Sequence, residues 1–131
     1  MLIGELARRS GVSARSLRYY EQHGLLSARR DVNGYRVYAE DDVRLAREIG
    51  VLLARGFSLA ETRPFVECLR SGHGAGDACP ESLEVYRRKL AELDACIADL
   101  QAARDRVAAQ LDQAALWSRT DPTCEFSREQ A

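Results

Sequence analysis

Long apolar runs are absent from this 131-residue chain: none approaches the roughly 18 consecutive apolar residues of a membrane-spanning helix. The first residues lack the basic segment and apolar block of a signal peptide, so we expect a cytoplasmic protein with no membrane partner. The glycine-rich stretch 71–77 is not followed by the Gly-Lys-Ser/Thr of a phosphate loop. No nucleophile–base motif occurs either, and these absences argue against an enzyme.

Closely spaced cysteines are also missing. The chain has four cysteines, Cys68, Cys79, Cys96 and Cys124, but no Cys-x-x-Cys pair, which argues against a zinc ribbon or a thioredoxin-like site. In a reducing cytoplasm we expect these thiols to be free. Cys68 lies among apolar residues and is expected to be buried packing, whereas Cys96 is expected to be a passive position on a helix interface.

Charge is distributed unevenly, although the net charge is only −1. Through Tyr38 the sequence has seven arginines against three acidic residues, and the remainder is acidic. A basic end on an acidic chain favours a polyanionic partner for that end alone. The alternative is a chance cluster of solvated arginines, which the charge alone does not exclude.

The basic end begins with two predicted helices joined by a tight turn. Apolar residues at helical spacing predict a helix over residues 2–9, and Gly11, which can take a positive φ, predicts the turn after it. Ser13 is a suitable N-cap for the second helix, which His23 and Gly24 end. This is a helix-turn-helix pattern, and the arginines and tyrosines of its second helix suit a phosphate-lined groove.

A small β-hairpin is predicted next. Asn33-Gly34 is a strong turn signal between residues 26–30 and 35–38. Acting as a wing, this hairpin would place its arginines along a phosphate backbone. The alternative is a structural flap whose arginines only solvate it, but the preceding helix-turn-helix favours the wing.

Two further helices are predicted before residue 70. Acidic residues at 40–42 favour the start of the third helix. Ser58 and Glu61 have capping-box spacing and open the fourth. Pro64 would kink this fourth helix unless the helix begins near Thr62.

A heptad repeat runs through the chain from Pro80 onward, after a polar, glycine-rich boundary. Its two seams place apolar residues every seven positions over about five heptads, with one polar exception, Arg104. The seams are Leu83, Leu90, Ile97, Arg104 and Leu111, and Tyr86, Leu93, Leu100, Val107 and Ala114. A long helix with one narrow apolar seam predicts self-association, because a helix packed back on its own domain would have a wider apolar stripe.

The order of these elements, together with several local motifs, resembles the MerR family of bacterial transcription regulators. The matching motifs are Ile3-Gly4-Glu5-Leu6-Ala7, Gly11-Val12-Ser13, Leu17-Arg18-Tyr19-Tyr20-Glu21, Gly24-Leu25-Leu26, Asn33-Gly34-Tyr35-Arg36-Val37-Tyr38 and Gly56-Phe57-Ser58-Leu59. The resemblance is close over about the first 70 residues and is one of architecture beyond them. It implies a mainly α fold, with a winged helix-turn-helix domain of four helices and a β-hairpin over 1–70 and a linker over 71–80. An antiparallel coiled-coil dimerisation helix would follow over 81–117, and an effector-sensing tail over 118–131.

The same resemblance implies a mode of action. A homodimer would place each N-terminal domain on one half of a pseudo-palindromic promoter. On effector binding it would bend and untwist an overlong spacer so that RNA polymerase holoenzyme can use it. The residues expected to contact DNA are Ser13, Arg15, Arg18 and Tyr19 on the second helix and Arg29, Arg30, Tyr35 and Arg36 on the wing. Leu17, Tyr20 and Tyr38 are expected to pack the domain.

Two cysteines suggest the effector. Family members that sense thiophilic metals carry one cysteine at the start of the long helix and more in the tail, and Cys79 and Cys124 match two of these positions. The resemblance therefore implies zinc, cadmium, lead or mercury as effector, held by Cys79 and Cys124 across an antiparallel dimer. A further tail cysteine of the family is missing here. Zinc usually takes four ligands, and His73 or Asp77 could supplement the two thiolates.

Two alternatives remain open at this point. Cys79 precedes Pro80 at a helix N-terminus, where the helix dipole favours a reactive thiolate, so a Cys79–Cys124 disulfide that responds to oxidants or electrophiles is one alternative. The other is a DNA-architectural winged-helix protein without a sensor. Such a protein would not need a long dimerisation helix with cysteines at both ends.

Overall fold

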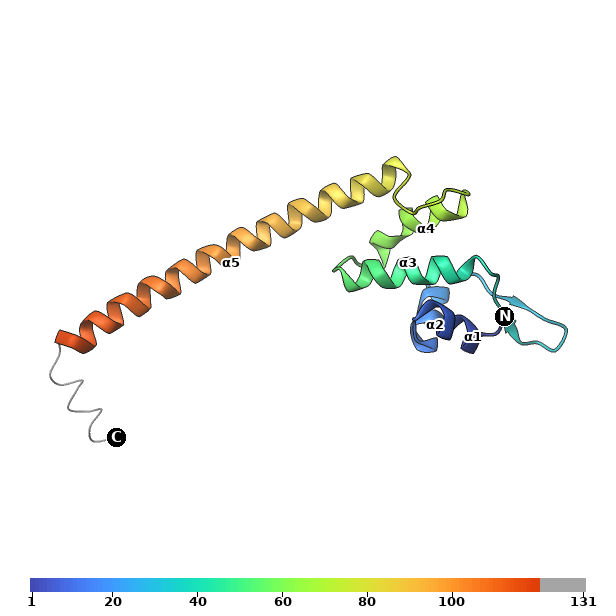
Figure 1. Ribbon diagram of the computed structural model, residues 1–131, viewed down its shortest axis with the longest axis horizontal. Coiled ribbons are helices and arrows are strands. Elements are labelled where there is room, and N and C mark those ends of the chain that lie inside the picture. Colours follow the sequence, from blue (N-terminus) through green and yellow to red (C-terminus); the bar gives the residue numbers. More distant parts are fainter. Residues whose placement is uncertain (121–131) are drawn as a thin grey trace, which may run out of the picture. The chain divides into compact units, whose positions relative to one another are not determined.

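The computed structural model describes the backbone of residues 1–120 and the side chains of residues 1–118 (Figure 1). The fold is mainly helical, as predicted. Its elements are α1 (Ile3–Ser10), α2 (Ala14–Gln22), β1 (Arg29–Arg30), β2 (Arg36–Val37), α3 (Asp42–Ala54), the 3₁₀ turn η1 (Ala60–Thr62), α4 (Arg63–Arg70) and α5 (Pro80–Thr120). The chain divides into one compact unit, Met1–Lys89, and a second that begins at Leu90. None of the helices in the described part of the chain has the length and apolar character needed to cross a membrane.

The predicted helix-turn-helix is confirmed. Gly11 takes a φ of 76°, and its N–H donates to the Ala7 carbonyl at 3.0 Å, which closes the end of α1. The Ser13 Oγ accepts the N–H of Ser16 at 3.1 Å and so caps α2. Both helices end within one residue of the predicted bounds.

The hairpin is also confirmed, but its turn depends on one more residue than the sequence suggested. β1 and β2 pair antiparallel, with Arg30 opposite Arg36. Gly34 takes a φ of 81°, as a tight turn requires. In addition, the Asp31 Oδ1 accepts the N–H of Asn33 at 2.9 Å and the N–H of Tyr35 at 3.0 Å. The Asp31 carboxylate therefore organises the loop together with the Asn33-Gly34 pair.

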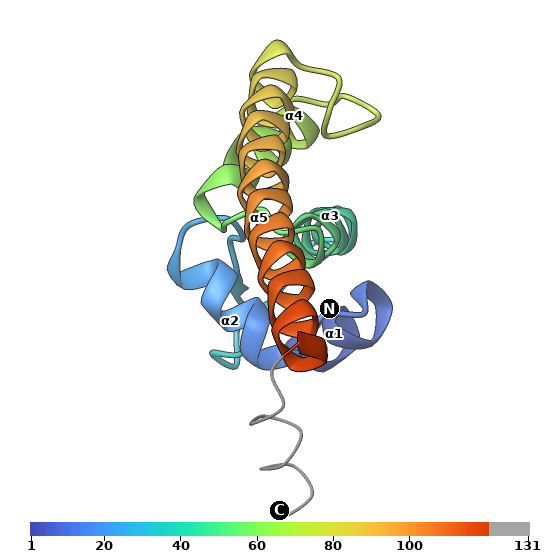
Figure 2. The same ribbon diagram turned by 90° about the vertical axis from the view of Figure 1, so that its left-hand side faces the viewer.

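In both views α3 lies between the α1–α2 pair and α4 (Figures 1 and 2). The larger hydrophobic core fills the space around it and is made of Leu6, Leu17, Tyr20, Leu25, Leu26, Tyr38, Val43, Leu45, Ala46, Ile49 and Val66. Leu17, Tyr20 and Tyr38 are all buried, which confirms their expected packing role. Since Leu17 and Tyr20 anchor one face of α2 in this core, its opposite face is left to solvent.

The fourth helix begins later than its capping box. The Ser58 N–H donates to the Glu61 Oε1 at 2.8 Å, and the Glu61 N–H donates to the Ser58 Oγ at 3.2 Å, so the predicted reciprocal pair is present. This pair opens the 3₁₀ turn, and α4 starts at Arg63. Pro64 is therefore in the first turn of α4, where its missing N–H costs no helical hydrogen bond.

The compact unit extends past the boundary expected at residue 70 and includes the first turns of α5. Val85 is buried with Phe57 and Phe65 in a second core cluster, and the Tyr86 ring lies 5.1 Å from that of Phe65. The buried Lys89 side chain forms an ion pair with Glu61 at 3.0 Å. These contacts hold residues 80–89 against the end of α3 and the start of α4, and they explain why the unit closes at Lys89.

From Leu90 onward the predicted seam is exposed in the single chain. Exposed fractions of its large apolar side chains range from 44% for Leu93 to 70% for Leu100. The others are Leu90, Ile97, Val107 and Leu111. α5 continues through residues 118–120, where a tail was expected, and residues 121–131 with Cys124 lie outside the described part of the chain.

Candidate nucleic-acid interface

The outward face of α2 carries the side chains predicted to contact DNA. Arg15 and Arg18 are exposed, and Tyr19 is half exposed. Tyr19 packs edge-on against the His23 ring, with centroids 4.4 Å apart. His23 was not among the predicted contacts, and this edge-to-face contact gives it a role in orienting Tyr19. Ser13 is exposed, but its hydroxyl also serves the N-cap.

A groove of about 410 Å³ joins α2 to the wing. Its basic and aromatic lining consists of Arg18 from α2 and Arg30, Tyr35 and Arg36 from the hairpin. Leu2, Ile3 and Gly34 complete the lining. Four of the eight predicted DNA-contacting residues thus meet in one concave surface, although they come from segments 12–18 residues apart in sequence.

Two of the three wing arginines, Arg30 and Arg36, are held in position by nearby acceptors. The Arg36 guanidinium forms an ion pair with Glu21 of α2 at 3.0 Å, and the Tyr38 hydroxyl donates to the same carboxylate at 3.3 Å. Burial, followed by the Glu21 charge, raises the pKa of Tyr38, so its phenol stays protonated as a donor. The Arg30 Nη1 donates to the Gly34 carbonyl at 2.7 Å. Glu21 therefore ties the wing to α2.

Three of the arginines predicted to contact DNA form no ion pair with a carboxylate of the described residues. Among the described residues, Arg15, Arg18 and Arg29 have no carboxylate within 4.0 Å. Their charges are open to an external anion, and arginine offers a planar set of donors that matches phosphate. This arrangement leaves three arginines without a carboxylate partner from the described part of the chain, on the surface that carries the predicted DNA contacts.

The cysteines depart from the expectation of free thiols. Cys68, on α4, and Cys79, directly before α5, form a disulfide with a Cα–Cα distance of 5.9 Å. Cys68 is buried as predicted, but it has a covalent partner, because the loop 71–79 returns Cys79 to the end of α4. His73 in that loop places its Nδ1 3.6 Å from the Cys79 Sγ. Cys96 is a free, exposed thiol.

The two supplementary ligands considered for Cys79 have different surroundings. His73 lies beside the sulfur atoms, whereas the Asp77 carboxylate accepts the Tyr86 hydroxyl at 3.2 Å. Cys124 lies outside the described residues, so its pairing with Cys79 stays a prediction. The spacing of Cys68, His73 and Cys79 offered only a weak signal, since no compact motif links them.

Comparison with known proteins identifies the family of this chain. A model of the "MerR HTH family regulatory protein" family matches residues 1–67, and a model described as "MerR, DNA binding" matches residues 43–110. A solved structure of HiNmlR, a MerR family regulator lacking the sensor domain and bound to promoter DNA, aligns with a TM-score of 0.54 at 28% identity. That alignment covers 80% of this chain and 78% of that one.

Curated relatives agree with the family models. The chain is 36% identical over 104 residues to the HTH-type transcriptional regulator HmrR of Rhizobium leguminosarum bv. viciae, covering 79% of this chain and 78% of the relative. It is 36% identical over 103 residues to the heavy metal-dependent transcription regulator 2 of Rhizobium meliloti, covering 77% and 67%. The chain belongs to the MerR family of DNA-binding transcriptional regulators.

Proposed function

We propose that this regulator binds promoter DNA as a homodimer through the groove between α2 and the wing, and that a thiophilic effector controls how it distorts the promoter. The observation that carries the proposal is the meeting of Arg18 with Arg30, Tyr35 and Arg36 in one groove. A duplex presents phosphates on both sides of its major groove. A helix in that groove with a wing along the adjacent backbone uses both sets of side chains at once.

The roles of the contacts follow from their chemistry. Arg15, Arg18 and Tyr19 project from α2 and contact the groove and its phosphates, while Ser13 presents its hydroxyl at the helix start. The wing residues Arg29, Arg30, Tyr35 and Arg36 hold the flanking backbone. Most of the affinity then comes from phosphate contacts and falls with added salt.

Dimerisation is supported by the exposed seam of α5. Leu90, Ile97 and Leu100 are exposed in the single chain and recur at heptad spacing. Burying such a seam against a second copy removes apolar surface from water at both helices. An antiparallel pairing gives the dimer two copies of the DNA-binding surface, which matches a pseudo-palindromic promoter.

Activation by promoter distortion would use both DNA-binding surfaces of the dimer. Phosphate contacts at both half-sites offset the cost of bending and untwisting the spacer between two promoter elements that lie too far apart. RNA polymerase holoenzyme would then engage both elements. The promoter-bound relative supports the DNA-binding part of this scheme.

The effector is a thiophilic metal ion such as zinc, cadmium, lead or mercury, bound at Cys79, for which the family resemblance offers Cys124 of the tail as one candidate second thiolate. The Rhizobium meliloti relative is a heavy metal-dependent transcription regulator, which supports this choice. Soft thiolates favour these ions over magnesium or calcium. Thiol oxidation is a second candidate, and the bond between Cys68 and Cys79 favours it.

Two experiments test the proposal. Selection of bound duplexes from a randomised pool should enrich an inverted repeat, and placing that repeat in an overlong promoter spacer should make transcription by RNA polymerase holoenzyme depend on this protein. A promoter with a spacer of ordinary length is the control, and it should not be activated. Enrichment of no sequence, or equal activation of both promoters, would contradict the proposal.

A further inference from the structure

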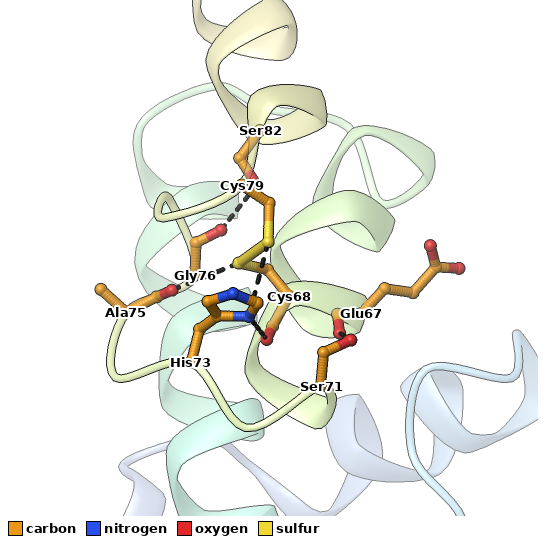
Figure 3. Close-up of a disulfide and its surroundings, with 8 residues drawn as sticks. All are labelled: Glu67, Cys68, Ser71, His73, Ala75, Gly76, Cys79 and Ser82. Carbon is orange, nitrogen blue, oxygen red and sulfur yellow. Dashed lines mark hydrogen bonds between the residues drawn. A yellow bond between two sulfur atoms is a disulfide. The ribbon is translucent and has the colours of Figure 1, made fainter.

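Three side chains of types that can ligate a metal ion come from different segments and meet at the junction of α4 and α5 (Figure 3). Cys68 lies on α4, His73 lies in the loop that follows, and Cys79 directly precedes α5. One ligand atom from each lies within 4.8 Å of the other two. All three residues belong to the compact unit Met1–Lys89, so a single chain supplies the whole cluster.

We propose that Cys68, His73 and Cys79 of one subunit bind a thiophilic divalent cation through two thiolates and one imidazole. This inference rests on the proposed metal response and assigns its ligands, with Cys68 and His73 in place of Cys124. Zinc and cadmium accept such a mixed sulfur and nitrogen set. Three protein ligands leave one position of a tetrahedral site for water or another small donor.

The loop that carries the ligands is fixed by bonds that do not involve sulfur. The Ser82 Oγ donates to the Gly76 carbonyl at 2.6 Å, the Tyr86 hydroxyl donates to Asp77, and Arg44 donates to the Gly74 carbonyl. Gly76 is buried, and a Cβ there would lie 3.2 Å from the Phe65 carbonyl oxygen. Reduction of the disulfide therefore leaves the two sulfur atoms facing each other, because the backbone that positions them is held independently.

The imidazole is oriented for ligation. Its Nδ1 lies 3.1 Å from the Cys68 carbonyl oxygen and 3.6 Å from the Cys79 Sγ (Figure 3). When Nδ1 binds the cation, it gives up the contact with the carbonyl, and the ring proton resides on Nε2. His73 is exposed, so water can accept that N–H.

Metal binding requires the reduced protein. A dithiol reductant supplies two electrons and two protons to the Cys68–Cys79 disulfide, which becomes two thiols while the reductant becomes a disulfide. The cation then displaces both thiol protons and forms two metal–sulfur bonds. The disulfide and the metal-bound form thus exclude each other.

The site is placed to act on α5. It joins α4 to the residue that precedes the first turn of α5, and Ser82, one turn further on, is bonded to the same loop. Metal binding would replace a short sulfur–sulfur bond by a longer sulfur–metal–sulfur bridge. The longer bridge would change the distance between α4 and the first turn of α5. Because α5 carries the proposed dimer seam, metal binding could in this way reach the dimer.

Direct cation binding tests the assignment. The full-length protein is reduced with a dithiol, freed of reductant and titrated with Cd²⁺, and cadmium–thiolate absorbance and native mass spectrometry give affinity and stoichiometry. We expect one ion per chain in the wild type and a loss of affinity of at least about 100-fold for Cys68→Ser and for Cys79→Ser. His73→Ala should weaken binding at least about tenfold. Cys124→Ser, Cys96→Ser and His23→Ala are the matched controls and should bind within about twofold of the wild type.

A wild-type measurement guards against misfolding of the Cys68 variant. Cd²⁺ should slow alkylation of Cys68 and Cys79 and leave the rate at Cys96 unchanged. Loss of binding in Cys124→Ser with retention in Cys68→Ser would overturn the assignment in favour of Cys79 and Cys124. The absence of any ion on reduced wild-type protein would overturn it as well. Either failure would leave the enrichment of an inverted repeat intact, whereas failure of the proposed DNA function would remove that enrichment and leave cation binding unchanged.

Discussion

The compact unit Met1–Lys89 and the helix from Leu90 use the same kinds of apolar residue in different ways. In the compact unit, helices α1 to α4 bury their apolar faces against one another, and Leu6, Leu17 and Phe65 are fully buried. In the helix beyond Leu90, the seam is exposed in the single chain. The difference shows that the first region forms its core within one chain, while the second leaves an apolar surface exposed, which the proposed dimer would cover.

The contrast also appears within α5 itself. Val85 and Tyr86 pack into the core cluster with Phe57 and Phe65, whereas Leu90, one turn further on, is exposed. One continuous helix therefore has two different parts: its first turns complete the core of the compact unit, and the remainder carries the exposed apolar seam that the proposed dimer would bury.

The largest expected effect comes from charging the seam. Ile97→Lys with Leu100→Lys would remove four apolar side chains from a dimer, at about 1.5 kcal/mol each or roughly 6 kcal/mol in total. Sedimentation should show a monomer at concentrations where the wild type is dimeric. Ala95→Lys with Ala102→Lys adds the same charge on the opposite face of the helix and should leave the dimer intact. If the dimer survives the seam substitutions, the seam is not the surface that a second chain buries, and the contrast between the two regions fails.

A core substitution in the compact unit should act within one chain. Phe65 is fully buried and its ring contacts Phe57 and Tyr86, so Phe65→Ala should lower the free energy of unfolding by about 3–5 kcal/mol. The loss should not depend on protein concentration, unlike the loss from Leu100→Ala. Denaturant unfolding at two protein concentrations measures both. A concentration-dependent loss for Phe65→Ala would contradict the view that this core closes within one chain.

Arg18→Ala should weaken DNA binding without affecting either fold or dimer. We expect a loss of about 1–3 kcal/mol in binding to the selected duplex and a decrease of about 2 in the salt slope, since each dimer loses two phosphate contacts. Titrations at several salt concentrations measure both. Arg88→Ala, an exposed arginine of α5, is the control and should change neither. If Arg18→Ala leaves both the affinity and the salt slope unchanged, Arg18 does not contact DNA, and the proposed interface on α2 is contradicted.

The smallest expected effect concerns the capping box. The Ser58 N–H, and to a lesser degree Lys89, hold the pKa of the Glu61 carboxyl below its ordinary value of 4.5, against the effect of desolvation. A lowered folded-state pKa contributes stability above the ordinary pKa, and this contribution is lost as the pH falls below about 4.5 through the folded value. Glu61→Gln should therefore cost about 1 kcal/mol at pH 7 and less at low pH. Thermal unfolding of both proteins between pH 7 and low pH measures this cost. A cost that stays the same at every pH would contradict the stabilising role of the Glu61 carboxylate.

Local signals in the sequence predicted most of the fold. Gly11, Ser13 and the Ser58–Glu61 pair act within a few residues of their own positions, so their roles could be inferred without the tertiary structure. The start of α4 was ambiguous because Pro64 permits a first-turn position but forbids an interior one. The heptad spacing likewise identified the seam.

The candidate sites could not be predicted in full, because they depend on contacts between residues that the sequence spacing does not reveal. The Cys68–Cys79 bond depends on the path of a nine-residue loop whose fixing bonds come from Arg44 on α3 and Ser82 on α5. The Glu21–Arg36 ion pair likewise joins residues 15 apart through the packing of the wing on α2. Both arise from tertiary structure, and a single sequence gives the residues but not their partners.

The mass of the complex with the selected duplex tests the central claim most directly. Analytical ultracentrifugation of the wild type with an inverted-repeat duplex should give two chains per duplex. A duplex with one half-site destroyed should bind far more weakly, and so should the variant with Ile97→Lys and Leu100→Lys on the intact duplex. One chain per duplex, with full affinity for a single half-site, would contradict the account.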